Sequence, residues 1–401
     1  MHRRHLLRSL LALAGVSPAA SALEPRSLVF PRDFGSHPET RIEWWYMTGE
    51  LRVRSAGSSA SARDTGRTTD RGDDVTRAAN RASEAARPSA APANTASGPA
   101  DTFGFQVTFF RSATGLAAAS PSRFAARQLV FAHAALSDLA GRRLRHDQRI
   151  ARAGFGVASA AEADTALVLD GWRLSREAAA PVGHYRTQLQ SDLAGFAFDF
   201  TVTPTQPVLL QGNAGWSRKG GRAEQASFYY SEPQLAVAGR LRVDGRTLDV
   251  DGRAWLDHEW SDSLLEAGAV GWDWIGMNLD DGSALTAFRI RDAQGGTRWA
   301  GGSFRRAGGS VQDFASGDVR FEPVRRWTSA ATRATYPVEW TVDTPAGRFA
   351  VKALLDDQEL DSRSSTGSVY WEGLSDLLDA SGRRVGRGYL EMTGYAAPLA
   401  L

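Results

Sequence analysis

The segment Trp255–Gly282 concentrates residue types that can do acid–base chemistry. Its 28 residues include four tryptophans, one histidine and seven carboxylates. At its start, "WLDHEW" predicts a strand, along which alternate side chains point to opposite faces. The two faces then carry Trp255, Asp257 and Glu259, and Leu256, His258 and Trp260.

This strand suits a reaction that passes through a positively charged intermediate. His258 is a proton-transfer group, and the ring face of Trp260 attracts positive charge. We predict Asp257 or Glu259 as the proton donor, because a buried carboxylic acid with a raised pKa can protonate an alkene. His258 would then activate water, and Trp260 and Trp272 would shield the cation.

The alternative is a structural role for the same residues. His258 would be a buried core histidine at a domain seam. Asp257 and Glu259 would form ion pairs with arginines such as Arg41 or Arg253.

A second aromatic segment, "RIEWWY" (41–46), predicts a polar anchor at the mouth of a ligand pocket. Glu43 would share a strand face with Arg41 and Trp45, and a carboxylate buried there must be paired. The alternative is a barrel-closing tryptophan beside a structural ion pair. The predicted ligand-binding residues are Arg41, Glu43, Trp44, Trp45, His37, His133, Trp260, Trp272 and Trp274.

Two of these residues are lone histidines. His133 lies among small apolar residues in "FAHAALSD", where a histidine is more often a hydrogen-bonded core residue than a ligand. A position facing His258 would change that interpretation. His37 lies in the loop "DFGSHPETR", as a functional residue or as the cap of a turn.

The motifs of cofactor and metal enzymes are missing. The chain has no cysteine, and His258 has no second histidine at zinc-helix spacing. We find no calcium loop, nucleophile elbow, Walker loop or dinucleotide fingerprint. We therefore expect no cofactor and no metal. The net charge of +2, without an aromatic-interleaved basic stripe, argues against nucleic-acid binding.

The first residues are typical of an export signal. Basic "MHRRHLLR" precedes the apolar "LLALAGV" and a small-x-small cleavage pattern, which predicts a signal peptide over 1–22, of the twin-arginine or the ordinary type. The apolar run is too short to span a bilayer. We expect an exported protein, periplasmic or secreted, that does not cross the membrane.

A low-complexity segment interrupts the first strand pair. Residues 54–101 hold mainly small and polar residues and too few large apolar ones to offset the entropy of ordering. We predict a disordered insertion in a hairpin turn, which costs little stability.

The remaining chain predicts an all-β protein. Short runs of period two alternate with turn signals, as in antiparallel sandwiches and barrels. "GRAWLD" (252–257) and "GRGYLE" (386–391) form a faint repeat, and "WWYMTGEL" parallels "WDWIGMNL". We therefore predict two similar barrels in tandem, over 27–260 and 261–401, with short helical pieces around 261–267.

Six ordered motifs resemble the AttH family of secreted proteins, which is related to the carotenoid 1,2-hydratases. They are "FPRDFGSHPETRIEWWYMTGEL", "FGFQVTFFR", "FAHAALSD", "YYSEP", "GRAWLDHEWS" and "GWDWIGMNLDDG". The resemblance implies tandem lipocalin-like barrels. The hydratases add water to an isoprenoid double bond without a cofactor and carry a His-x-Trp unit, which His258 and Trp260 match here. They also need an acid near a tyrosine, and no Tyr-x-Asp follows "MNLDDG".

Two principal functions remain open. The first is carriage of an apolar isoprenoid- or lipid-like ligand, in association with an ABC-transporter permease. It predicts a continuous apolar cavity without strongly perturbed carboxylates. The second is an acid-catalysed hydratase or a secreted hydrolase. A purely structural role is the third interpretation.

Overall fold

The computed structural model describes residues 23–54, 102–116, 120, 122, 124–179, 182–263 and 265–399. The predicted signal peptide and nearly all of the predicted insertion lie outside the described residues. Within the described ranges, no helix is long and apolar enough to cross a membrane.

The described chain forms strands and one short 3-10 helix. The helix is η1 (Arg32–Phe34). The first half holds β1 (Ile42–Val53), β2 (Thr102–Ala113), β3 (Gln128–Asp138), β4 (Arg143–Arg152), β5 (Ala158–Ala160), β6 (Ala166–Leu169), β7 (Trp172–Glu177), β8 (His184–Ser191), β9 (Phe196–Thr203), β10 (Leu209–Leu210), β11 (Trp216–Arg218), β12 (Ala226–Val243) and β13 (Arg246–Ser261). The second half holds β14 (Ala269–Leu279), β15 (Ala284–Asp292), β16 (Thr297–Arg305), β17 (Val311–Phe314), β18 (Arg320–Thr328), β19 (Thr335–Thr344), β20 (Gly347–Ala353), β21 (Glu359–Ser362), β22 (Ser368–Leu378) and β23 (Arg384–Thr393).

The first antiparallel sheet runs in the order β4-β3-β2-β1-β13-β12-β9-β8-β7-β6-β5, and β10 and β11 pair with β12. Strands β5 and β6 return to contact β3 and β4, so the sheet nearly closes into a barrel. Period-two alternation places Phe196, Phe198, Phe200 and Val202 of β9 in one buried core, with Phe105 of β2. Packed side chains fill this part of the interior.

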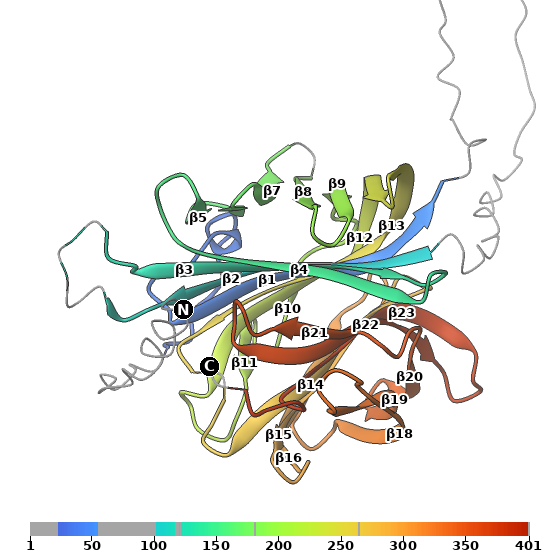
Figure 1. Ribbon diagram of the computed structural model, residues 1–401. Helices are drawn as coiled ribbons and strands as arrows, with labels where there is room; N and C mark the ends of the chain where they lie inside the picture. The colour runs from blue at the N-terminus through green and yellow to red at the C-terminus, as the bar shows by residue number, and fades with distance from the viewer. Residues whose placement is uncertain are drawn as a thin grey trace, which may run out of the picture.

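The second antiparallel sheet runs β17-β16-β15-β14-β23-β22-β20-β19-β18, and β21 pairs with β22. Its own core includes Ile275, Met277, Trp340 and Trp371. In Figure 1 the strands of the first sheet, blue to yellow, lie over those of the second, orange to red. The prediction of two tandem antiparallel barrels of lipocalin-like type is confirmed.

The chain passes from one sheet to the other between Ser261 and Ala269. In the described part of this connector the backbone forms turns and bends, so the short helical pieces expected there are not seen. The physical reason is that the long strands β13 and β14 take up the residues on both sides and leave too few for a helical turn with stable packing.

The two sheets meet along a seam that is apolar and aromatic. The outer face of β1 and β13 packs on the outer face of β14, β22 and β23. The apolar and aromatic residues buried in the seam are Tyr46, Leu209, Trp255, Trp274, Ala284, Phe288, Ile290, Leu374 and Tyr389. Polar side chains between these residues are therefore removed from water on both sides.

Candidate functional site

Strand β13 presents two different sets of polar residues on its two faces. Asp257 and Glu259 point outward into the seam, where Tyr229 and Lys219 meet them. His258 points inward, stacked on Trp45 at 4.4 Å between ring centroids. The period-two alternation that predicts this division holds along the whole segment from Trp255 to Trp260.

The inward set forms the barrel-end cluster, which we define as Asp33, His37, Glu43, Arg111 and His258. Glu43 lies at its centre and is fully buried. Its Oε1 lies 2.7 Å from His37 Nδ1 and 2.9 Å from His258 Nε2. Its Oε2 accepts from Arg111 Nε at 2.7 Å and from the His37 backbone N–H at 2.9 Å.

The cluster continues outward through Asp33. His37 Nε2 lies 2.9 Å from Asp33 Oδ1, and the Arg26 guanidinium donates to both oxygens of Asp33 at 2.7 Å. Arg111 Nη2 also donates to the carbonyl oxygens of His37 and Thr40. Every charge in the cluster therefore has an opposite charge in direct contact.

Pairing sets the ionisation of the carboxyls and of His37. Burial alone would raise the pKa of Asp33 and of Glu43, but hydrogen bonds from their partners outweigh it and hold both pKa values well below the usual range. Burial would lower the pKa of His37, but Asp33 and Glu43 outweigh it and raise that pKa. Both ring nitrogens of His37 face carboxylate oxygens, which can only accept, so His37 is an imidazolium between two carboxylates. Its ring stacks on Trp260 at 3.8 Å between ring centroids.

His258 differs from His37. Burial lowers its pKa to about 4, although Glu43 opposes the shift. At neutral pH its ring is uncharged. Nε2–H must donate to the Glu43 carboxylate, which can only accept, so Nδ1 accepts from the Tyr230 hydroxyl at 3.0 Å. Both ring nitrogens are occupied, which favours a structural role.

His37, Glu43 and His258 could also hold a metal, because their ligand atoms lie within 4.8 Å of one another. An ion there would displace the protons that bind both rings to Glu43. It would also face the guanidinium of Arg111. The contacts favour a hydrogen-bonded cluster at this position.

The outward set begins with Asp257. It accepts from Tyr229 Oη at 2.8 Å, Ser231 Oγ at 2.5 Å and Trp255 Nε1 at 2.7 Å. Burial nevertheless raises its pKa to about 7, and the three hydrogen bonds oppose that shift. Asp257 can therefore exchange a proton near neutral pH.

Glu259 lies two residues farther along the same face of β13 and is an ion-paired carboxylate. Lys219 Nζ lies 2.9 Å from its Oε1, and Ser227 Oγ donates to the same oxygen at 2.5 Å. The Lys219 ammonium also lies over the rings of Tyr229 and Phe288 at 4.6 and 4.4 Å. Neither acid pairs with Arg253, which instead contacts Glu50 and Asp280.

Two further seam carboxyls come from the second barrel and were not predicted. Glu372 of β22 and Glu391 of β23 are register partners in neighbouring strands, and the side chain of Glu372 is buried. Burial, strengthened by Glu391, raises the pKa of Glu372 well above its usual value. Burial raises the pKa of Glu391 to about 7, and Asp257 and Glu259 add to the shift.

Glu372 also lacks partners. Neither of its oxygens completes a hydrogen bond within the described part of the chain. The Tyr46 hydroxyl lies near enough to lower the pKa of Glu372, yet it also completes no hydrogen bond of normal geometry there. Gln106 Oε1 is a fourth such atom. Native buried polar atoms are nearly always paired, so we take this group as part of the candidate functional site.

We call Tyr46, Asp257, Glu372 and Glu391 the seam cluster. The faint repeat aligns Asp257 in "GRAWLD" with Glu391 in "GRGYLE", so the repeat could have identified Glu391. No comparable signal marks Glu372, because its position depends on how the two sheets dock.

The other predicted ligand-binding residues are divided between several places. Trp44, Trp272 and Trp274 lie in or against the seam. His133 faces the seam from β3, away from His258, with Nδ1 2.9 Å from Tyr370 Oη. Trp45, Trp260, Glu43 and His37 belong to the end of the first barrel. Arg41 lies outside β1, with its backbone N–H bound to Asp262.

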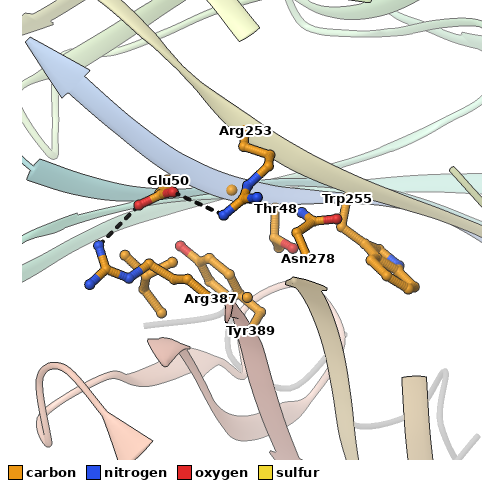
Figure 2. Close-up of a pocket in the computed structure, with 10 residues that line it drawn as sticks. Thr48, Glu50, Arg253, Trp255, Asn278, Arg387 and Tyr389 are labelled. Atoms are coloured by element: carbon orange, nitrogen blue, oxygen red, sulfur yellow. Dashed lines mark hydrogen bonds and ion pairs between the residues drawn. The ribbon is translucent and has the colours of Figure 1, made fainter. Parts of the chain in front are cut away.

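Two cavities lie at the edges of the seam. One has a volume of about 260 Å³ and is lined by the connector and the start of β1, including Ile42, Leu265 and Ala269. Leu265 and Ala269 also pack against the aromatic seam cluster. The other, of about 10 Å³, lies between β1, β13 and β23, and Figure 2 shows its lining.

Comparisons with known proteins agree with this architecture. The model of the AttH-like family matches residues 91–395. A crystal structure assigned to AttH, from Nitrosomonas europaea, is 42% identical, covers 94% of this chain and 99% of that chain, and has a TM-score of 0.75. Kievitone hydratase from Nectria haematococca is 15% identical, with 92% and 94% coverage and a TM-score of 0.61, and shares the fold. No curated protein matches the chain. The predicted resemblance is confirmed: the chain belongs to the AttH-like family.

Proposed function

We propose that the seam is a cofactor-independent acid–base site that adds water to, or removes water from, an apolar alkene-bearing molecule. The observation that carries this proposal is the buried Glu372, whose oxygens complete no hydrogen bond within the described chain, beside Glu391 in an aromatic seam. Burial and Glu391 raise the pKa of Glu372, which favours its protonated form, and a protonated buried carboxyl is the acid that alkene protonation needs.

Glu372 is the proposed proton donor. Its proton goes to one alkene carbon, and the π electron pair forms the new C–H bond. The other carbon becomes a cation and Glu372 becomes a carboxylate. Glu391 shares the negative charge of the pair, since coupled carboxyls titrate together.

Asp257 is the proposed base. The oxygen of a water molecule attacks the cation and forms the C–O bond, and Asp257 takes the proton that the water loses. Three hydrogen bonds stabilise the carboxylate form of Asp257, whereas within the described chain only the nearby Tyr46 hydroxyl favours that form of Glu372, so the two environments favour opposite roles. Proton exchange with solvent returns both groups to their starting states.

The aromatic residues of the seam suit the cation. Trp272 and Trp274 belong to or pack against the buried aromatic cluster of the seam. A tryptophan face stabilises positive charge more strongly where water is excluded. Kievitone hydratase shares this fold, and its name is consistent with water addition as the reaction class.

The test is a panel of apolar alkenes and tertiary alcohols incubated with the protein in water enriched in oxygen-18. We expect a product that gains one labelled water. Glu372→Gln and Asp257→Asn should each reduce turnover by at least about 100-fold. His258→Gln is the matched control on the opposite face of β13, and it should retain turnover if the folded fraction is equal. Equal turnover in Glu372→Gln and wild type would contradict the proposal.

A second candidate is carriage of an apolar ligand, which a specific observation keeps open. The open pocket of about 260 Å³ includes Leu265 and Ala269, which pack against the aromatic residues of the seam, and it is slightly smaller than a typical small-ligand site. This function would come with export and an ABC-transporter permease as partner, for which the support is the signal-peptide pattern and the family resemblance. A ligand that co-purifies unchanged from the periplasm would favour carriage, and a hydrated or dehydrated product would favour catalysis.

A further inference from the structure

The cavity of about 10 Å³ at the seam is lined by residues of both barrels. They are Thr48, Gly49, Glu50, Arg253, Trp255, Asn278, Leu374, Arg387, Gly388 and Tyr389. In Figure 2 the side chains of Thr48, Asn278 and Tyr389 approach the same space from three strands. A volume on the order of 10–15 Å³ accommodates one water molecule and nothing larger.

The lining has the polarity that a single bound water requires. A buried water needs two to four polar partners, roughly three on average. Thr48 offers a hydroxyl, Asn278 an amide group, and Glu50 and Arg387 charged groups. Asn278 itself is fixed, since its Nδ2 donates to the Ala254 carbonyl and its Oδ1 accepts from the Gln234 backbone N–H. The cavity is therefore preorganised and not a packing defect.

Strand register places this cavity directly beside the seam cluster. Thr48 pairs with Trp255, and Tyr46 pairs with Asp257, two residues along on the same face. Two residues of a strand span roughly 6.6 Å. Trp255, which lines the cavity, donates Nε1–H to Asp257. Tyr389, on the other side, is near enough to Glu372 for that carboxyl to raise the pKa of the phenol.

The outer end of the cavity is a partly exposed ion cluster. Glu50 lies 3.0 Å from Arg387 and 3.7 Å from Arg253, and Arg253 also pairs with Asp280. Arg253 and Asp280 are partly exposed, so solvent reaches this end. The larger pocket at the connector has a mixed polar and apolar lining, and its Leu265 and Ala269 pack against the aromatic residues of the seam.

We propose that this cavity binds the water molecule that serves as nucleophile and proton carrier for the seam cluster, and that water enters from the Glu50–Arg387 end. This inference rests on the proposed acid–base function. The apolar substrate would occupy the aromatic side of the seam, so the two reactants approach the carboxyls from different directions. Such a division keeps bulk water away from the cation while one water stays in place.

The experiment follows hydrogen–deuterium exchange of the protonated seam carboxyls by infrared spectroscopy of the full chain. The C=O stretch of a protonated carboxyl shifts when its proton is replaced by deuterium. Thr48→Leu fills the cavity from β1 and Leu374→Phe fills it from β22. Thr48→Val is the matched control because it keeps the volume of threonine.

In both filled variants, exchange must wait for the seam to open, so we expect it to be at least about tenfold slower than in Thr48→Val. If one filled variant does not fold, the other still decides the result. A protonated-carboxyl signal that exchanges equally fast in all variants overturns the water cavity and leaves the acid site intact. A wild-type protein without that signal at neutral pH overturns the acid site, and the inference falls with it.

Discussion

The barrel-end cluster and the seam cluster lie on opposite faces of β13, and they solve the burial of carboxyls in opposite ways. In the first, Glu43 is in contact with His37, His258 and Arg111. In the second, Glu372 has no partner that completes a hydrogen bond in the described chain. A paired buried charge supports the fold, whereas an unpaired acid is available for chemistry.

The carboxyls of the two clusters must also respond to pH with opposite signs. The pKa values of Asp33 and Glu43 are lowered by folding, so their stabilisation is present above about pH 4 and is lost as the pH falls. The pKa values of Asp257 and Glu391 are raised to about 7. Their contribution is fully present below about pH 4 and is lost as the pH rises through 7.

The largest effect is expected from breaking the barrel-end cluster. Arg111→Met leaves the Glu43 carboxylate buried without its guanidinium and should lower the free energy of unfolding by about 3–5 kcal/mol at neutral pH. Urea denaturation measures this loss. Arg186→Met removes a half-exposed pairing with Asp199 and should cost less than about 1 kcal/mol. Equal losses in the two variants would show that Arg111 is not a buried structural partner.

The seam should show a gain of stability where the barrel end shows a loss. Glu391→Gln keeps the shape of the side chain and cannot ionise, so it should stabilise the protein by about 3 kcal/mol at pH 8. At about pH 4 both proteins carry a neutral side chain and should be equally stable. Thermal unfolding of both proteins across this pH range tests the sign of the stability difference between Glu391→Gln and wild type. A variant that is less stable than wild type at pH 8 would reverse the comparison.

His258 and Asp257 are neighbours in sequence but belong to different clusters, so variants at these two positions should separate an effect on stability from an effect on turnover. His258→Gln loses one hydrogen bond and the stack on Trp45, so it should cost about 1–2 kcal/mol without abolishing turnover. Asp257→Asn should abolish turnover at little cost in stability. Unfolding and activity measured on the same preparations check both. Loss of turnover in folded His258→Gln would return the catalytic role to the histidine.

The smallest effect is expected at the exposed end of the barrel-end cluster. Arg26 is 42% exposed in its side chain, so Arg26→Met should cost less than about 1 kcal/mol. Its clearer consequence is a rise in the pKa of Asp33, because the Arg26 hydrogen bonds lower it. Acid unfolding should then begin at a higher pH than in wild type. An unchanged acid transition would mean that His37 alone fixes the ionisation of Asp33.

The sequence predicts the fold class and the division of polar residues between the two faces of β13, because both depend on local patterns. Alternation alone assigns Asp257 and His258 to opposite faces of the strand, and the structure places them on opposite faces of β13. The repeat between the halves predicts two similar barrels, and the two sheets confirm it.

The partners of these residues are not local, and the sequence does not show them. Glu43 meets His258 across a separation of 215 residues. Glu372 faces the seam only because β22, a strand of the second sheet, docks against β1 and β2 of the first sheet. The sequence predicts His37 as a functional loop residue or as the cap of a turn. Its place between two carboxylates depends on η1 and β1 together.

The most direct test of the central claim is the infrared signal of protonated carboxyls at neutral pH, compared among wild type, Glu372→Gln, Glu391→Gln and Glu43→Gln. The structure predicts a signal in wild type that both seam variants reduce and that a folded Glu43→Gln variant leaves unchanged. A wild-type protein whose buried carboxyls are all ionised, or a signal that only Glu43→Gln removes, would contradict the assignment of the chemistry to the seam.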